Sequence, residues 1–260
     1  MNYFVFDIET IPDVEAGRRL YDLRDLGDDA VVEAMLLKRR EETSGSDFLR
    51  LTLHRVVCIS CVLRTSDQLR IWSLGEADSD EKSLLQRFFK GIERYVPTLV
   101  SWNGSGFDLP VINYRALMHG LAAPKFWDQG EDDRDFRYNN YISRYHQRHI
   151  DLMDMLAMYQ SRAIQPLDHV ASLLGFPGKM GMSGDAVWPA WKNGEHDRIR
   201  TYCETDVMNT WLVFLNFQKL RGHLSEAAYI QELEIMKQLL SASTEPVWQE
   251  FLSVWQGGRR

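Results

Sequence analysis

Two acidic residues, Asp7 and Glu9, end an otherwise apolar stretch close to the start of the chain, residues 3–9. The aromatic and β-branched side chains of this stretch predict a β-strand, in which positions two apart point to the same side. The two carboxylates should therefore point together, and burying them without a partner would be unfavourable. We expect a cation or solvent beside them, with two solvated acids at a strand end as the simpler alternative.

Two later segments add carboxylates at places where chemistry could use them. Residues 103–108 read Asn-Gly-Ser-Gly-Phe-Asp, and their glycines allow a tight turn ahead of Asp108. A common alternative for Asp108 is a helix N-cap. Tyr202 and Asp206 lie four positions apart in a segment with helical spacing, so they share one helix face. The alternative there is a phenol–carboxylate contact on a solvated face.

These segments together supply four carboxylates and one phenol from separate elements of the chain. Oxygen ligands of this kind suit Mg²⁺ or Mn²⁺ and not Zn²⁺. Two such ions about 4 Å apart can hold the attacking and the leaving oxygen of a phosphodiester in line. The pattern therefore indicates metal-dependent phosphodiester hydrolysis. The residues concerned are Asp7, Glu9, Asp108, Tyr202 and Asp206.

In their order along the chain, the three segments resemble the exonuclease motifs of the DEDD superfamily. They read FDIET around Asp7, N-x-x-x-F-D up to Asp108, and Y-x-x-x-D up to Asp206. The match is to the tyrosine subtype, because the histidine subtype has His at the position that Thr201 occupies here. The chain looks most like the stand-alone predicted 3'–5' exonucleases related to the proofreading domain of family-B DNA polymerases.

The resemblance implies an RNase H-like fold, two divalent metal ions and a role for each motif residue. Asp7, Glu9 and Asp206 would hold the first ion, and Asp7 with Asp108, partly through water, would hold the second. Tyr202 would orient the attacking water. The implied reaction releases nucleoside 5'-monophosphates from a 3' end.

Candidate substrate contacts lie beside these motifs and in a basic segment. The resemblance places Asn103 and Phe107 against the terminal nucleotides. Residues 134–148 carry four arginines against one acid, with interleaved aromatic residues, which suits a single strand. An ordinary solvated loop is the alternative for this segment. Its candidate contacts are Arg137, Arg144 and Arg148. Lys179, in a glycine-rich stretch, could touch a phosphate, although a plain surface lysine is the commoner explanation.

The apolar patterns predict the elements that must position these side chains. Strands are expected at residues 3–9, 55–63, 69–74 and 98–102. Helices are expected at residues 28–42, 79–95, 108–119, 151–159, 167–174, 198–220 and 225–240, with a last one after Pro246. This order predicts an α/β fold with a mixed sheet flanked by helices. We expect a single domain over residues 1–260, with insertions at about 13–50 and 120–150 and C-terminal helices at about 225–255.

Composition excludes several classes of protein. The chain has 260 residues, of which 45% are hydrophobic and 26% charged, so it is globular and neither disordered nor fibrous. A net charge of -7 disfavours coating nucleic acid by charge alone, but not meeting it at one local site. Three cysteines form no disulfide framework, and no stretch reaches the roughly 18 apolar residues of a membrane span. We expect a cytoplasmic protein without a membrane segment.

The function predicted from the sequence is a metal-dependent 3'–5' exonuclease acting on DNA, with single strands favoured. Two alternatives stay open, an RNA 3'–5' exonuclease or oligoribonuclease, and a catalytically silent module that binds nucleic-acid ends or a protein. A zinc hydrolase is disfavoured because Cys58 and Cys61, three apart in a predicted strand, face opposite sides. With its end at residue 260, the chain is expected to be the nuclease without a polymerase domain. Its oligomeric state is left open.

Overall fold

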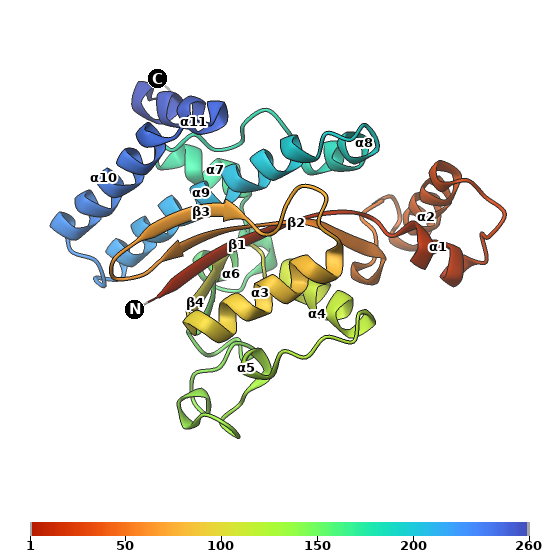
Figure 1. Cartoon of the computed structure of the whole chain (residues 1–260), viewed down its shortest axis with the longest axis horizontal. Helices are drawn as coiled ribbons and strands as arrows, with labels where there is room; N and C mark the ends of the chain where they lie inside the picture. The colour runs from red at the N-terminus through yellow and green to blue at the C-terminus, as the bar shows by residue number, and fades with distance from the viewer. Residues whose placement is uncertain (1, 259–260) are drawn as a thin grey trace.

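The computed structural model describes residues 2–258 and shows a five-stranded sheet with helices packed on both faces (Figure 1). The order across the sheet is β3-β2-β1-β4-β5. The strands are β1 (Tyr3–Pro12), β2 (His54–Arg64), β3 (Leu69–Ser73), β4 (Thr98–Ser101) and β5 (His149–Asp151). β1, β2 and β3 pair antiparallel in chain order, whereas β4 runs parallel to β1 and β5 parallel to β4. The mixed sheet predicted from the sequence is therefore confirmed.

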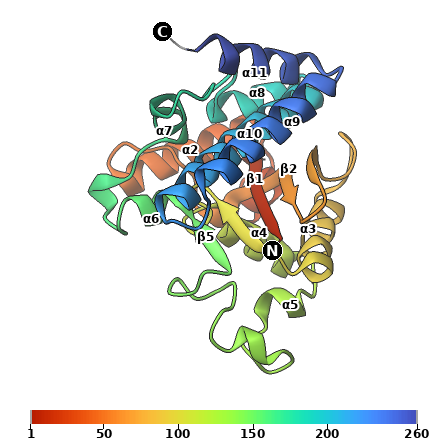
Figure 2. The same ribbon diagram turned by 90° about the vertical axis from the view of Figure 1, so that its left-hand side faces the viewer.

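Helices account for most of the remaining chain. They are α1 (Val14–Tyr21), α2 (Asp28–Thr43), α3 (Glu81–Tyr95), α4 (Asp108–Met118), α5 (Pro124–Trp127), α6 (Leu152–Leu156), α7 (Leu167–Leu173), α8 (Val187–Lys192), α9 (His196–Leu220), α10 (Glu226–Ala242) and α11 (Pro246–Gly257). The two views place α3 and α4 on one face of the sheet and α9 to α11 on the other (Figures 1 and 2). Among the described residues, no helix combines the length and the apolar character needed to cross a membrane.

The side-chain alternation of β1 divides the core into two layers. Phe4 and Phe6 pack with the apolar residues of α3 and α4. Val5 points the other way and packs in the layer that contains α9. Because positions two apart share a side, Asp7 and Glu9 follow Val5 and face α9. The strand therefore directs both carboxylates toward the helix that carries the third motif.

Parallel pairing brings the carboxyl ends of three strands to the same edge of the sheet. Asp7 of β1 lies at this edge. β4 leads into the second motif, and β5 ends at Asp151. The pairing of β1 with β2 shifts in register between Glu9 and Thr10, so β1 is irregular directly after the acid pair. Chemistry-bearing residues are thus gathered at this edge, as is usual for the carboxyl ends of parallel strands.

The predicted elements are found to within a few residues, and the differences involve short pieces. Residues 120–150 were expected to be irregular, but they contain α5 and end in the edge strand β5. The helix expected at 151–159 is shorter, Leu152–Leu156. α1 and α8 were also missed. Elements of three to eight residues carry too few turns or alternations to give a period in the sequence.

Candidate active site

The acid pair of β1 lies against α9 and forms the centre of the candidate site. One oxygen of Asp7, one oxygen of Glu9 and the thiol sulfur of Cys203 lie within 4.8 Å of one another. Glu9 is buried, whereas Asp7 keeps part of its surface exposed. The Cys203 thiol donates to the backbone oxygen of Asp7 at 3.4 Å and to its carboxylate at 3.5 Å. The sequence prediction that Asp7 and Glu9 point together is confirmed by this contact.

Asp108 joins this pair through a hydrogen bond across 100 residues of chain. Its Oδ1 accepts the backbone N–H of Ile8 at 3.1 Å, between the two acids of β1. Asp108 is the first residue of α4, and Phe107 occupies the N-cap position without a side-chain cap. The N-cap alternative is therefore wrong in position, and the buried Asp108 carboxylate accepts both its own backbone N–H and that of Ile8 in β1.

Tyr202 and Asp206 complete the set from α9. The Tyr202 hydroxyl donates to the Asp206 carboxylate, as their spacing of four on one helix face allows. Lys179 lies close to Asp206, and both residues line a small cavity of about 160 Å³ together with Tyr202 and Asp168. The structure therefore brings the glycine-rich stretch that carries Lys179 to the third motif.

Burial and mutual repulsion act in the same direction on the acids. Burial, with the nearby Asp108 and Asp206, raises the pKa of Asp7 well above its usual range, and burial with Asp7 does the same for the pKa of Glu9. Burial raises the pKa of Asp108 to about 7, although the Ile8 N–H opposes this. Burial raises the pKa of Asp206 to about 6, against the effects of the Tyr202 hydroxyl and the Lys179 ammonium.

A divalent cation would balance the charge that this cluster carries once its acids are ionised. Within residues 2–258, no ion pair includes Asp7, Glu9, Asp108 or Asp206. Buried charges in proteins are normally paired or coordinate a metal. The donors are carboxylate oxygens, which hard cations such as Mg²⁺ and Mn²⁺ prefer. The residues therefore fit the metal that the sequence predicts.

The second-motif loop is held in place by an acid that lies outside the three motifs. Asp151 accepts the backbone N–H of Asn103 at 3.0 Å and that of Ser105 at 2.8 Å. Its carboxylate also accepts the N–H groups of Met153 and Asp154, so it caps α6. Asn103 adopts a left-handed backbone conformation with φ 65°. The Asp151 contacts compensate for this strain and set the turn that precedes Asp108.

Phe107 belongs to an aromatic cluster that includes a residue of the region between β1 and β2. Its ring centroid lies 5.1 Å from that of His54 and 5.6 Å from that of Phe48. Phe48 is 53% exposed, which is high for a large apolar side chain. The cluster forms an aromatic surface next to Asp108. Phe48 gave no signal in the sequence, because it lies in a polar loop far along the chain from Phe107.

Comparison with known proteins bears on the family resemblance seen in the sequence. Residues 46–255 match the family described as predicted 3'–5' exonucleases related to the exonuclease domain of PolB. The chain belongs to this family. The resemblance seen in the sequence is confirmed. The family match starts after β1, so it covers Asp108, Tyr202 and Asp206, while Asp7 and Glu9 lie before it.

Relatives of this exonuclease family member are DNA polymerases. The chain is 25% identical over 150 residues to a DNA polymerase of Archaeoglobus fulgidus, covering 56% of the chain and 19% of the polymerase. It is 50% identical over 46 residues to the catalytic subunit of DNA polymerase epsilon from Dictyostelium discoideum, covering 17% of the chain and 2% of that protein. The chain thus spans less than a fifth of the length of these relatives.

A solved structure supports the same fold. The family B DNA polymerase of Pyrobaculum calidifontis matches with a TM-score of 0.50 and 18% identity. The match covers 84% of this chain and 24% of the polymerase. The RNase H-like α/β architecture predicted for this exonuclease family member is therefore confirmed.

The three arginines predicted as substrate contacts in the basic segment lie in different surroundings. Arg148 lies 4.0 Å from the centre of the buried Phe136 ring and donates to the backbone oxygen of Asn139 at 2.5 Å. Arg137 lies over Tyr138. Arg144 lies 4.8 Å from the centre of the Tyr159 ring. Of the three, Arg144 alone lines a large cavity of about 630 Å³.

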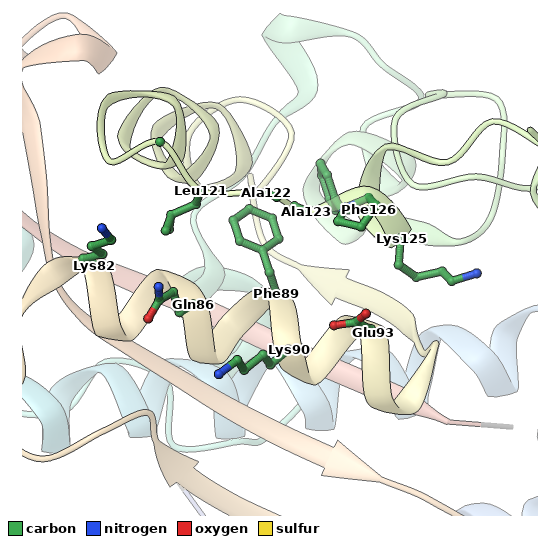
Figure 3. A pocket seen from close by; sticks show the side chains of 12 residues that line it. Lys82, Gln86, Phe89, Lys90, Glu93, Leu121, Ala122, Ala123, Lys125 and Phe126 are labelled. Carbon is green, nitrogen blue, oxygen red and sulfur yellow. The ribbon is translucent and has the colours of Figure 1, made fainter. Parts of the chain in front are cut away.

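A further cavity holds none of the predicted site residues. It has about 310 Å³ and lies between α3 and residues 120–126. Figure 3 shows Phe89 and Lys90 of α3 on one side and Lys125 beside Phe126 on the other. Lys125 is already paired with Asp133 at 3.3 Å. This cavity therefore plays no part in the candidate active site.

Proposed function

We propose that this member of the exonuclease family is an active, metal-dependent 3'–5' exonuclease that releases nucleoside 5'-monophosphates from single-stranded DNA. The observation that carries the proposal is the cluster of four carboxylates, none of which forms an ion pair within residues 2–258, with Tyr202 beside it and a single ammonium, that of Lys179, near Asp206. A silent binding module would have no need of such an unfavourable arrangement. The names of the relatives, which are DNA polymerases, support DNA as the substrate.

The four acids would hold two Mg²⁺ or Mn²⁺ ions. Asp7, Glu9 and Asp206 would bind one, and Asp7 with Asp108 the other. Bound divalent ions supply a nucleophilic water at neutral pH and neutralise the charge that develops on the scissile phosphate. Loading the cluster also requires the protons on Asp108 and Asp206 to leave, because their pKa values are about 7 and about 6.

Tyr202 acts as an orienting hydroxyl in this proposal. Burial, with the nearby Asp206 and Glu9, raises the pKa of Tyr202 far above that of a free phenol. The phenol therefore stays protonated at neutral pH and donates to Asp206. A donor held in this way can position a water or a phosphate oxygen, whereas it cannot remove a proton from the water.

Two features of the site would hold the end of the strand. Phe48 and Phe107 offer an exposed aromatic surface beside Asp108, and stacking on aromatic side chains is sequence-tolerant because every base has a π-face. Lys179, beside Asp206, would face the phosphate that the acids themselves repel. Both features suit an unpaired 3' end of any sequence.

An assay with end-labelled strands tests the proposal. Wild-type protein with Mn²⁺ should shorten single-stranded DNA from its 3' end and release 5'-mononucleotides, and EDTA should stop it. Asp7→Asn and Asp206→Asn should each lower the rate at least about 100-fold. Asp197→Asn, an exposed acid on the same helix α9, is the matched control and should leave the rate unchanged.

Several results of this assay would contradict the proposal. Cleavage that starts internally, or that continues in EDTA, would exclude a metal-dependent exonuclease. If the Asp206→Asn variant cleaved at the wild-type rate, the acid cluster would not be needed for the reaction. Matched RNA strands form the second arm, and faster digestion of RNA would replace DNA by RNA as the substrate.

A further inference from the structure

A large cavity lies next to the second-motif loop and outside the acid cluster. It has about 630 Å³ and is lined from α4, α5, residues 141–147, β5 and the segment that begins with α6. We call it the aromatic hollow. The lining residues that the argument needs are Trp127, Arg144, Tyr145, Asp154 and Tyr159. Ser105 and Asp151 also line it, and Asp151 holds the second-motif loop, so the hollow adjoins the proposed active site.

The aromatic side chains of the hollow are left open to solvent. Trp127 is 49% exposed, Tyr159 46% and Tyr145 87%. Other aromatic residues nearby are buried, including Phe126 and Tyr141, whose rings stack with centroids 5.7 Å apart. The aromatic residues around the hollow thus fall into a buried set and a solvent-exposed set. Open aromatic rings around a hollow are suited to stacking.

The backbone takes a left-handed conformation at Tyr159, which lines the hollow. Met158 and Tyr159 both have left-handed φ values, 53° and 59°, which are uncommon for residues other than glycine. Their N–H groups donate to Met155 at 3.1 Å and to Asp154 at 2.8 Å. Strain of this kind persists where surrounding contacts enforce it, and it concentrates at binding sites.

The opposite wall is also ordered before any ligand binds. The backbone N–H of Asn140 donates to the Nδ1 atom of His146 at 3.0 Å, and the N–H of Ser143 donates to the Asn140 side chain at 3.0 Å. Arg144 lies over the Tyr159 ring and, among the described residues, forms no ion pair. Its guanidinium also lies 5.7 Å from the centre of the Tyr145 ring and near Asp154, and from there it would reach a phosphate at the rim.

We propose that the aromatic hollow binds a nucleobase of the single strand whose 3' end lies in the active site. The base would stack on Tyr159 and Tyr145, with its backbone phosphate paired to Arg144. The acids Asp151 and Asp154 inside the hollow would repel a phosphate, so the base and not the backbone enters. This inference rests on the proposed nuclease function, because it assigns a second contact to the same substrate.

Fluorescence of 2-aminopurine tests the proposal directly. The probe is placed at successive positions of a 12-nucleotide DNA strand, and binding is measured in EDTA so that no strand is cut. Stacking should quench the probe at one internal position. Tyr159→Gly, which tolerates the left-handed backbone, and Tyr145→Ala, at a solvent-exposed ring, should each abolish this quench. Arg144→Ala should weaken binding at least about fivefold. Tyr114→Ala and Arg94→Ala, exposed residues outside the hollow, are the controls.

A kinetic arm separates this proposal from the proposed function. With Mn²⁺, the three hollow variants should raise KM for the 12-nucleotide strand at least about fivefold and leave hydrolysis of thymidine 5'-monophosphate p-nitrophenyl ester unchanged. Uniform quenching along the strand, or hollow variants that bind like wild type, would overturn the inference. If wild-type protein hydrolyses neither substrate, the nuclease function fails, and the quench in EDTA still decides whether the hollow holds a base.

Discussion

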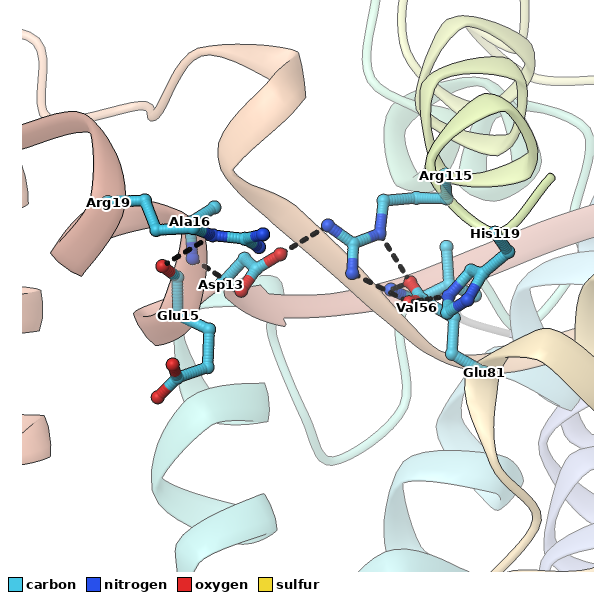
Figure 4. A network of polar contacts seen from close by, with 8 residues as sticks. All are labelled: Asp13, Glu15, Ala16, Arg19, Val56, Glu81, Arg115 and His119. Carbon is cyan, nitrogen blue, oxygen red and sulfur yellow. Dashed lines mark hydrogen bonds and ion pairs between the residues drawn. The ribbon is translucent and has the colours of Figure 1, made fainter.

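Two clusters of buried acids occur in this protein, and they are built in opposite ways. In the first, Asp13 and Glu81 surround the guanidinium of Arg115, as Figure 4 shows. Arg115 donates to both Glu81 oxygens, at 2.8 and 2.7 Å, and to Asp13. His119 and the backbone N–H of Val56 complete the hydrogen bonds of Glu81, each at 2.7 Å. In the second cluster, at the candidate active site, four acids lie together, and within the described residues none of them forms an ion pair, although Lys179 lies near Asp206.

The difference separates acids that the fold itself pairs from acids to which we assign a function. The Arg115 cluster is complete within the chain, and it ties α4 to the start of α3 and to the residue that caps α1. The acid cluster of β1, α4 and α9 has no ion pair within the described residues, and in our proposal a metal ion supplies the opposite charge. Burial alone therefore does not identify a site. Several acids close together without an ion pair are a stronger indication, because each raises the cost of ionising the others, whereas a single buried acid such as Asp151 can be satisfied by backbone N–H groups.

The largest effect on stability is expected from removing the cation of the first cluster. Arg115→Met leaves Asp13 and Glu81 buried and unpaired, so the free energy of unfolding should fall by about 3–5 kcal/mol. Urea unfolding followed by circular dichroism measures it. Arg198→Met, which removes an exposed ion pair with Glu195 at 2.7 Å, is the control and should cost less than about 1 kcal/mol. Equal losses in both variants would remove the contrast between the clusters.

A smaller effect of opposite sign is expected from removing one acid of the second cluster. The pKa of Asp108 is about 7 in the folded protein, against 3.8 for an ordinary aspartate, so the folded state holds this proton more tightly. The contribution of Asp108 therefore becomes destabilising as pH rises from about 4 to about 7, and the full cost remains above pH 7. Asp108→Asn should stabilise the metal-free protein at pH 8 by about 1–3 kcal/mol.

Measuring both proteins by urea unfolding at pH 4.5 and pH 8, in EDTA, checks this prediction. Asparagine keeps an acceptor for the N–H of Ile8, so the hydrogen bond to β1 is retained. The gain should be several times smaller at pH 4.5, where the folded carboxyl is protonated and only the unfolded one, with its ordinary pKa of 3.8, still loses its proton. A loss of stability at pH 8 would show that the Asp108 carboxylate is already compensated within the fold.

Local patterns made the acid cluster predictable. Asp7 and Glu9 follow from strand alternation, and Tyr202 with Asp206 follows from helix spacing, because both patterns operate within a few residues. The order of the motifs added Asp108. The Arg115 cluster was not predictable, since its partners are 34 and 102 residues apart in the chain and no local period links them.

Other features could not be predicted either, because they depend on tertiary contacts that no local sequence pattern shows. Phe48 reaches Phe107 only through tertiary folding, and β5 is too short to give an alternating pattern. The arginines of the basic segment, residues 134–148, look alike in the sequence, but packing places them in different surroundings. Arg148 lies on the buried Phe136 ring, whereas Arg144 reaches the aromatic hollow. Composition cannot distinguish these two outcomes, because both need arginine beside aromatic residues.

Calorimetric titration with Mn²⁺ is the most direct test of the central claim that the unpaired acids form a metal site. Wild-type protein at pH 6.5 should bind two ions and release protons, seen as a dependence of the heat on the ionisation enthalpy of the buffer. Proton release should decline at pH 8.5, because Asp108 and Asp206 have pKa values of about 7 and about 6. Asp7→Asn should bind neither ion tightly. Unchanged binding in Asp7→Asn, or no binding to the wild type, would contradict the account.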